Sequence, residues 1–158
     1  MKSGLVYCLK NFHLRRKNPI MQAKGNAPFF NEIFNEDCIA GMQAHGLRRI
    51  ISTTGAGVRD PQDQPKLIDH IMKGLLTLLA RDVLADSAAN VKLIQSSGLD
   101  WTIVRYPRLL DGTHTAKYRV GYVGRDSGSQ LSRADGADFV LKELTANQWI
   151  GKSPIVSY

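Results

Sequence analysis

The chain has 158 residues, of which 43% are hydrophobic and 22% are charged, and its formal net charge is +7. This length suits one globular domain with enough apolar material for a core, which excludes a disordered or fibrous chain. The longest apolar run, residues 68–80, is broken by polar side chains and is too short for a membrane span. The two cysteines form no metal or disulfide pattern, so we expect a protein of the reducing cytoplasm, without a bound metal or a membrane partner.

The positive charge is concentrated near the amino terminus. Residues 1–31 contain six lysines and arginines and no acidic residue, whereas the remaining residues carry 15 basic and 14 acidic groups. We therefore predict a basic N-terminal segment over residues 1–30 and a domain over residues 31–158. The segment loosely has the composition of a transit peptide or a basic arm, but we favour a poorly packed leader. The domain is almost neutral, so a nucleic-acid partner is not expected.

The domain is predicted to begin with a helix between Asn31 and Gly46. Apolar residues recur there at helical spacing, Asn31 suits the N-cap position, and Gly46 suits the position just beyond a helix. A β-branched run over residues 47–54 follows and ends in the Gly-Ala-Gly of residues 55–57. This pattern is typical of a buried strand that enters a tight loop.

Helical and extended patterns continue to alternate in the second half. Residues 66–97 predict one long broken helix or two helices, ended by Gly98, and residues 101–106 predict a second buried strand, ended by Pro107. The later patterns are a loop, an edge strand, a helix and a last strand, at residues 111–115, 118–123, 132–144 and 154–157. Parallel neighbouring strands need helical crossovers, so the alternation predicts an α/β domain with a largely parallel sheet.

Two loops are candidates for function, because ligands of open α/β sheets bind beyond the carboxyl ends of the strands. After the first strand, Thr53, Thr54 and Gly55 offer hydroxyl and backbone N–H groups to a polar ligand. The plain structural alternative is a turn in which glycine supplies an unusual backbone conformation. Spacing alone leaves both interpretations open.

The second loop holds residues of a different kind. Tyr106, Pro107 and Leu109 offer an apolar wall to a flat ring, and Arg108 offers a positive charge to phosphate or carboxylate. The alternative is a strand edge that simply ends at proline.

No catalytic group stands out. The Gly55-x-Gly57 pair lacks the third glycine of a dinucleotide fingerprint, and no tyrosine has a lysine four residues on. We interpret His114 as a solvent-facing turn residue, and Asp135 and Asp138 as charges in the first turn of a helix. The catalytic residues are therefore unknown.

Three segments of the sequence resemble a known family. HGLRRIISTTGAG (residues 45–57), SGLDWTIVRYPRLL (97–110) and LSRADGADF (131–139) resemble the atypical short-chain dehydrogenases/reductases, in particular the NAD(P)H-binding NmrA-like and biliverdin/flavin reductase-like members. The resemblance covers about residues 31–157. It implies a Rossmann-like fold in which Thr53, Thr54 and Gly55 line the nicotinamide ribose. Tyr106, Pro107, Arg108 and Leu109 would then flank the nicotinamide ring and the substrate.

The family's phosphate-binding motif is not in this sequence. Family members open with a strand and a G-x-x-G-x-x-G loop that holds the pyrophosphate, followed by a strand whose end selects NAD or NADP. The resemblance therefore implies the carboxyl-terminal portion of a Rossmann-like, mainly parallel, doubly wound sheet, with the N-terminal strands missing. NADP is the cofactor expected by analogy with the family, and NAD stays open.

Two functions follow from these patterns. The leading hypothesis is an NAD(P)H-binding oxidoreductase that transfers hydride to a small conjugated acceptor, namely a flavin, quinone or tetrapyrrole. Arg108 would bind an anionic acceptor. The alternative is a non-catalytic truncated relic or regulatory fragment that binds a protein partner through an exposed sheet edge. A homo-oligomer, or pairing with residues 5–9, would cover the same edge.

Overall fold

A computed structural model describes residues 27–65 and 67–158, except for the side chains of residues 27–34 and 67–81. The segments predicted over residues 1–26, including the strand-like residues 5–9, lie outside the described residues. The elements are α1 (Ala27–Ala44), β1 (Arg49–Gly55), α2 (Leu67–Ser96), β2 (Asp100–Tyr106), β3 (Arg108–Leu110), β4 (Arg119–Gly121), β5 (Gln130–Ser132), α3 (Arg133–Ala146) and β6 (Ile155–Ser157).

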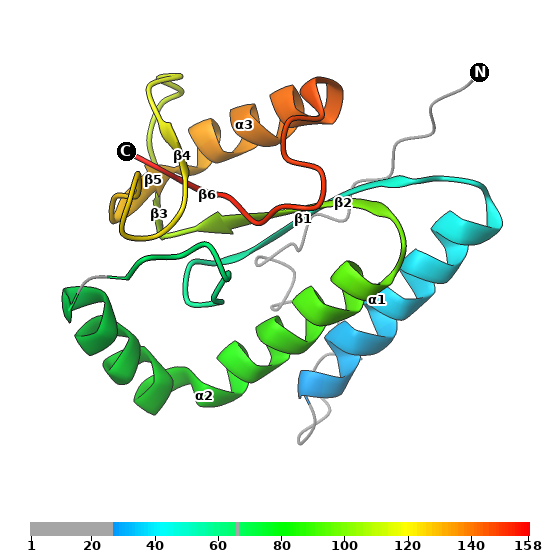
Figure 1. The fold of residues 1–158 in the computed structure, drawn as a ribbon, viewed down its shortest axis with the longest axis horizontal. Helices are drawn as coiled ribbons and strands as arrows, with labels where there is room; N and C mark the ends of the chain where they lie inside the picture. The colour runs from blue at the N-terminus through cyan, green and yellow to red at the C-terminus, as the bar shows by residue number, and fades with distance from the viewer. Residues whose placement is uncertain (1–26, 66) are drawn as a thin grey trace.

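The strands form a mainly parallel sheet, as expected from the sequence. The sheet has the order β1-β2-β6-β4, in which β1, β2 and β6 are parallel and β4 pairs antiparallel with β6 at one edge. A small second sheet pairs β3 with β5 in parallel. Figure 1 shows the strands between α3 on one side and α1 and α2 on the other.

Alternation along two neighbouring strands explains why helices cover both faces. Ile50 and Ile103 are buried in a cluster with side chains of α1 and α2, whereas Ile51 and Val104 are buried with side chains of α3. Successive side chains of a strand point to opposite faces, so the two residues of each adjacent apolar pair pack into different hydrophobic clusters, one on each side of the sheet. The β-branched runs therefore encode a doubly wound sheet.

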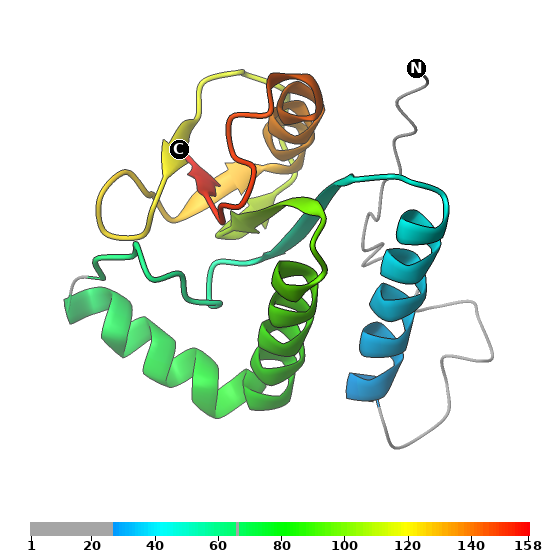
Figure 2. The same ribbon diagram turned by 45° about the vertical axis from the view of Figure 1, so that its right-hand side comes forward.

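The helix boundaries confirm part of the prediction. Gly46 and Gly98, expected to end α1 and α2, have φ angles of 67° and 71°, a conformation that favours glycine. The prediction of Asn31 as the N-cap was wrong, because α1 begins at Ala27. Pro28 is tolerated in the first turn, where backbone N–H groups have no intrahelical partner. The long apolar segment forms the single helix α2, which bends midway (Figure 2).

A buried ion pair joins the sheet to the loop that follows β1. Arg105, at the carboxyl end of β2, has a side chain only 1% exposed and donates two hydrogen bonds to Asp63, at 2.6 and 2.8 Å. It also donates to the carbonyl oxygens of Val58 and Ser153. Asp63 in turn accepts from the backbone N–H of Val123, at 3.1 Å. One guanidinium therefore fixes the loop, β2 and the segment before β6 together.

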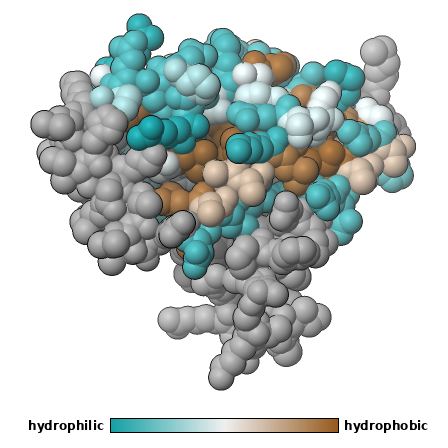
Figure 3. Space-filling model, turned by 60° about the horizontal axis from the view of Figure 1, so that its bottom comes forward, coloured by the Kyte–Doolittle hydropathy of each residue, from teal (hydrophilic) through white to brown (hydrophobic). Residues whose placement is uncertain are grey.

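Two kinds of feature are absent from the residues that the structure describes. None of the described helices is long and apolar enough to cross a membrane. The described residues also contain no group of three or more histidine, cysteine or acidic side chains placed to hold a metal ion. Seen mostly from the side of α1 and α2, the described residues present a band of apolar side chains (Figure 3).

We expect the substitution Asp63→Ala to destabilise the fold strongly. It leaves the guanidinium of Arg105 buried without a counter-charge, which costs about 3–5 kcal/mol. Urea unfolding gives the free energy of unfolding of each variant. The matched control is Asp100→Ala, because Asp100 pairs with Arg48 at exposed positions (side chains 39% and 70% exposed) and such pairs contribute about 0–1 kcal/mol. Equal losses in the two variants would contradict the prediction.

Candidate functional site

The two loops expected to hold the site meet at the carboxyl ends of β1 and β2. Gly55 is in register with Tyr106, and the backbone N–H of Ala56 donates to the carbonyl oxygen of Tyr106 at 2.8 Å. Residues that lie about 50 positions apart in the sequence are therefore adjacent. The structure brings together the two groups of residues that the sequence singled out.

The β1 side of the site is open. Gly55 is exposed, and a Cβ atom added to it would meet no atom within 4 Å. Thr53 and Thr54 are half-buried, and their hydroxyls form no hydrogen bond within the described part of the chain. Side chains alternate along the strand, so the two hydroxyls flank the strand end from opposite faces. Both are available to a polar ligand beyond Gly55.

The β2 side is held by a contact with α3. Tyr106 is half-buried, and its hydroxyl donates to the carbonyl oxygen of Gly136 at 2.8 Å. A Cβ atom added to Gly136 would lie 3.3 Å from the Tyr106 ring, so glycine permits this close approach. Burial raises the pKa of Tyr106, and the nearby hydroxyl of Tyr118 raises it further. Tyr106 is therefore a protonated, fixed side chain at neutral pH.

The expectation of a loop after Tyr106 was wrong in part, because residues 108–110 form the short strand β3, which pairs with β5. The other expected residues of this segment differ in exposure. Leu109 is half-buried and packs with Tyr106 against the cluster that includes Val104 and Phe139, so it contributes to the core beside the site. Pro107 is half-buried between β2 and β3. Arg108 is exposed, and its guanidinium forms no ion pair with any described residue. Arg108 is thus the charged group of this loop that is available to an anion.

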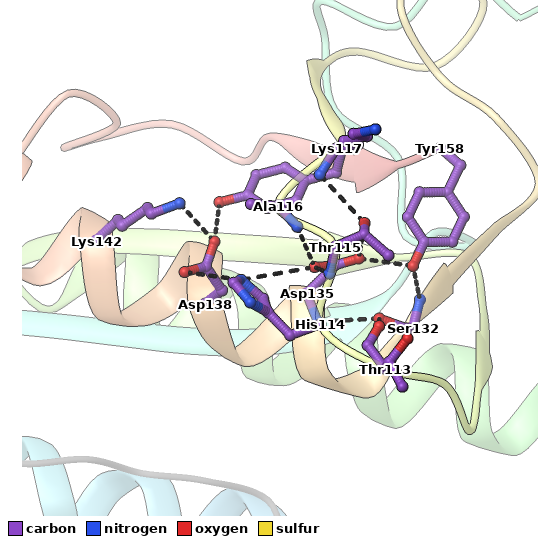
Figure 4. Close-up of polar contacts among 11 residues, drawn as sticks. Thr113, His114, Thr115, Ala116, Lys117, Ser132, Asp135, Asp138, Lys142 and Tyr158 are labelled. Carbon is purple, nitrogen blue, oxygen red and sulfur yellow. Dashed lines mark hydrogen bonds and ion pairs between the residues drawn. The ribbon is translucent and has the colours of Figure 1, made fainter.

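A polar cluster lies at the start of α3 (Figure 4), in the helical turn whose Gly136 accepts the hydrogen bond of Tyr106. Asp135 is fully buried and accepts hydrogen bonds from the hydroxyls of Thr115 and Tyr158, at 2.7 and 2.6 Å, and from the backbone N–H groups of Thr115 and Ala116. Burial alone would raise the pKa of Asp135, but these hydrogen bonds outweigh it and hold the pKa well below its usual range. Asp135 does lie in the first helical turn, as predicted, but as a buried anchor.

A second carboxylate of α3 lies nearer the surface. Asp138 accepts from Lys142 Nζ and from the hydroxyl of Tyr118, both at 2.7 Å. His114 Nε2 lies 3.3 Å from Asp138 and 3.8 Å from Asp135. The hydrogen bonds from Lys142 and Tyr118 hold the pKa of Asp138 below its usual value. His114 is half exposed, so the expectation of a solvent-facing residue holds, although the sequence did not reveal its acidic neighbours.

Sequence reasoning missed the buried charges around the site. An arginine inside the apolar run WTIVRY was one available signal, because a buried guanidinium needs an acceptor. Asp63 and Asp60 were candidates in the loop after β1, and the structure selects Asp63. The signal for Asp135 was weaker. Its position three residues after Ser132 indicates a helix cap, and Ser132 does accept from the Asp135 N–H at 3.0 Å.

The chain matches a family model and several solved structures. The family model, described as NAD(P)H-binding, matches residues 15–147. The chain is similar to a short-chain dehydrogenase/reductase from Veillonella parvula in complex with NADP (TM-score 0.66, 18% identity, 80% of this chain and 58% of that one). It is similar to ChuY, an anaerobilin reductase from Escherichia coli O157:H7 (TM-score 0.60, 20% identity, 80% of this chain and 58% of that one). It is also similar to the oxidoreductase YlbE from Lactococcus lactis (TM-score 0.63, 12% identity, 84% of this chain and 57% of that one).

The family model agrees with the expected NAD(P)H-binding family, and the solved structures confirm the expected Rossmann-like fold class. The solved structures are less than 25% identical to the chain, so each shows the fold alone. The chain spans 57–58% of the length of these three proteins. The expectation of nicotinamide cofactor binding agrees with the family model.

We expect the stability of the protein to fall below about pH 4, near the ordinary aspartate pKa. Asp63 is held below its usual pKa despite burial, through hydrogen bonds from Arg105, Asp60 and Val123, and Asp135 is also held low. A lowered folded-state pKa contributes stability above the unfolded-state value and loses it as the pH falls through the folded-state value. Urea unfolding between pH 7 and pH 3 tests this. Asp63→Asn should flatten the acid dependence, and an unchanged slope would contradict the assignment.

Proposed function

Because the chain belongs to the NAD(P)H-binding family, we propose that the carboxyl ends of β1 and β2 take the nicotinamide end of NADPH. We further propose that hydride passes from there to a small conjugated acceptor, which is a flavin, quinone or tetrapyrrole. The observation that carries this proposal is the open strand end at Gly55, next to Tyr106. Parallel α/β sheets bind ligands at this edge.

The residues present fit the nicotinamide end of the cofactor. A Cβ atom added to Gly55 would meet no atom within 4 Å, so no side chain crowds the strand end at that point, and the hydroxyls of Thr53 and Thr54 can hydrogen bond to a ribose. When bound, the nicotinamide supplies the hydride, and the protein supplies position and electrostatics. NADPH is our choice over NADH by analogy with the family.

The surrounding residues have distinct parts in this proposal. Tyr106, fixed by its hydrogen bond to Gly136, limits the movement of the loop after β2. The pair of Arg105 and Asp63 holds the loop after β1 in place. Arg108, exposed and without an ion pair among the described residues, would attract an anionic acceptor.

A second candidate function is binding of a protein partner through the outer edge of β1. Within the described residues, β1 is an edge strand whose Ile50 and Ile51 are buried on opposite faces, and after Arg49 it contains no charged residue or proline. Natural edge strands usually carry such protection against pairing. A regulatory fragment that lacks catalysis would use this edge to add a strand from its partner, or from a second copy of the chain.

NADPH titration with nicotinamide fluorescence tests the first function, and Gly55→Val is the informative variant. Its branched side chain would enter the space beyond β1, so we expect affinity for NADPH to fall about tenfold, or roughly 1.4 kcal/mol. Stability should stay within about 0.5 kcal/mol, because Gly55 is exposed and a Cβ atom added to it would meet no atom within 4 Å.

The titration is repeated at two salt concentrations, so that attraction to the basic segment is not counted as binding. Saturable, salt-tolerant binding by the wild type supports the cofactor site. Absence of saturation in a folded protein would refute it and favour the second candidate. Equal affinity in Gly55→Val and the wild type would remove this strand end from the site.

Arg108→Ala tests the anchoring of the acceptor. We expect the KM for flavin mononucleotide to rise about tenfold with kcat reduced less than about twofold, because ground-state attraction to the acceptor is lost. The matched control is Arg48→Ala, since Arg48 is an exposed arginine just before the amino end of β1, opposite the site. An unchanged KM would exclude Arg108 from acceptor binding.

A further inference from the structure

The segment between β3 and β4 is tied to α3 along its whole length. We call residues 111–118 the strap. It has no regular secondary structure, and residues 111–117 are exposed. Nevertheless, four side chains at the start of α3 form hydrogen bonds or ion pairs with residues along the strap. The contacts are Arg133–Asp111, Ser132–Thr113, Asp135–Thr115, Asp135–Ala116, Asp138–His114 and Asp138–Tyr118. An exposed loop is thus held in one path.

Asp135 is the central residue among these contacts. Its two carboxylate oxygens accept from the Thr115 N–H and the Ala116 N–H, at 2.8 and 2.9 Å, and from the Thr115 hydroxyl. Ala116 has a φ angle of 55°, which is uncommon for a residue with a side chain. Such a conformation persists only where the surroundings enforce it, and it often occurs at functional sites. Here the enforcing group is the buried carboxylate.

The same turn of α3 also holds the candidate site. Gly136, which follows Asp135, accepts the hydrogen bond of the Tyr106 hydroxyl. The strap leaves β3, which follows Tyr106 and Pro107 directly. Figure 4 shows Asp135 between the strap and Tyr158, whose hydroxyl donates to Asp135 and accepts from the Ser132 N–H. The strap and Tyr106 therefore share one rigid support.

We propose that the strap is the acceptor-binding wall of the site, and that Asp135 is the positioning residue that holds this wall next to Tyr106. The proposal rests on the proposed reductase function. Arg108 and Lys117, near the two ends of the strap, are exposed cations that form no ion pair with described residues. The acceptor that fits is a flat conjugated anion, and Asp135 itself touches neither acceptor nor cofactor.

Asp135→Asn tests the proposal with the full chain. The amide keeps the size of the side chain but loses the charge and one acceptor oxygen. Nuclear magnetic resonance measures hydrogen exchange at the Thr115 and Ala116 amides, which we expect to become at least about tenfold faster. Fluorescence or absorbance titrations measure dissociation constants for flavin mononucleotide, biliverdin and NADPH. The value for the acceptor that the wild type binds should rise about tenfold, and the NADPH value should change less than about twofold.

Two further variants separate positioning from general stability. Asp100→Asn changes an equally charged residue at the amino end of β2, in an exposed pair with Arg48, and should leave every reading unchanged. Thr115→Val removes the hydroxyl that donates to Asp135 and accepts from the Lys117 N–H, and it leaves the carboxylate in place. We expect Thr115→Val to speed amide exchange and weaken acceptor binding as Asp135→Asn does, with free-energy changes about a third as large. If Asp135→Asn does not fold, Thr115→Val takes its place in the test. In steady-state kinetics, the KM for the acceptor should rise more than kcat falls.

The outcomes distinguish this proposal from the proposed function. Faster exchange with weaker acceptor binding and unchanged NADPH binding supports the strap as the acceptor wall. Unchanged acceptor binding in a variant with faster exchange overturns it, as does a wild type that binds neither flavin mononucleotide nor biliverdin. If the wild type binds an acceptor probe but not NADPH, the proposed reductase function fails, while the acceptor readings still decide the role of Asp135.

Discussion

The buried guanidinium of Arg105 is the interaction on which the arrangement of the site depends. It lies at the carboxyl end of β2, where the backbone must turn away from the sheet, and it hydrogen bonds to both oxygens of Asp63 and to two carbonyl oxygens. A buried charge is costly unless all of its donors are satisfied. The loop after β1 must therefore fold back over β2, whatever else the loop contacts. This constraint leaves Gly55 at the open strand end.

The two sides of the site are supported in different ways. The β1 side is fixed by the buried ion pair of Arg105 and Asp63, which connects the loop after β1 to the sheet. The side of Tyr106 is fixed from outside, by the first turn of α3 through Gly136 and Asp135. Both supports use charged or polar groups removed from water, where hydrogen bonds are directional and geometrically specific. A site between two such supports is preorganised, which is what binding a flat, rigid ligand requires.

The fold could be predicted from the sequence because its signals are local. The runs RRIISTT and WTIVRY carry the β-branched residues of buried strands, and Gly46 and Gly98 mark the helix ends. The start of α1 was missed because Asn31 has the side chain of a cap, and the helix continues past it towards Ala27. Parallel topology predicted that the carboxyl ends of the two strands lie at the same edge of the sheet, whereas the register of Gly55 with Tyr106 is known only from the structure. The contacts of Asp63 and Asp135 could not be predicted, since they join residues 42 and 20 positions apart through side-chain geometry.

The close approach of Tyr106 to Gly136 makes these two positions dependent on each other. A methyl group at position 136 would lie 3.3 Å from the ring, so the ring or the helix would have to shift to make room for it. A smaller side chain at position 106 would provide that room. The effects of the two substitutions on stability should therefore be non-additive, because a smaller side chain at position 106 reduces the cost of a larger one at position 136. A substitution within α3 would in this way act on the residue that pairs with Gly55 at the carboxyl end of β1.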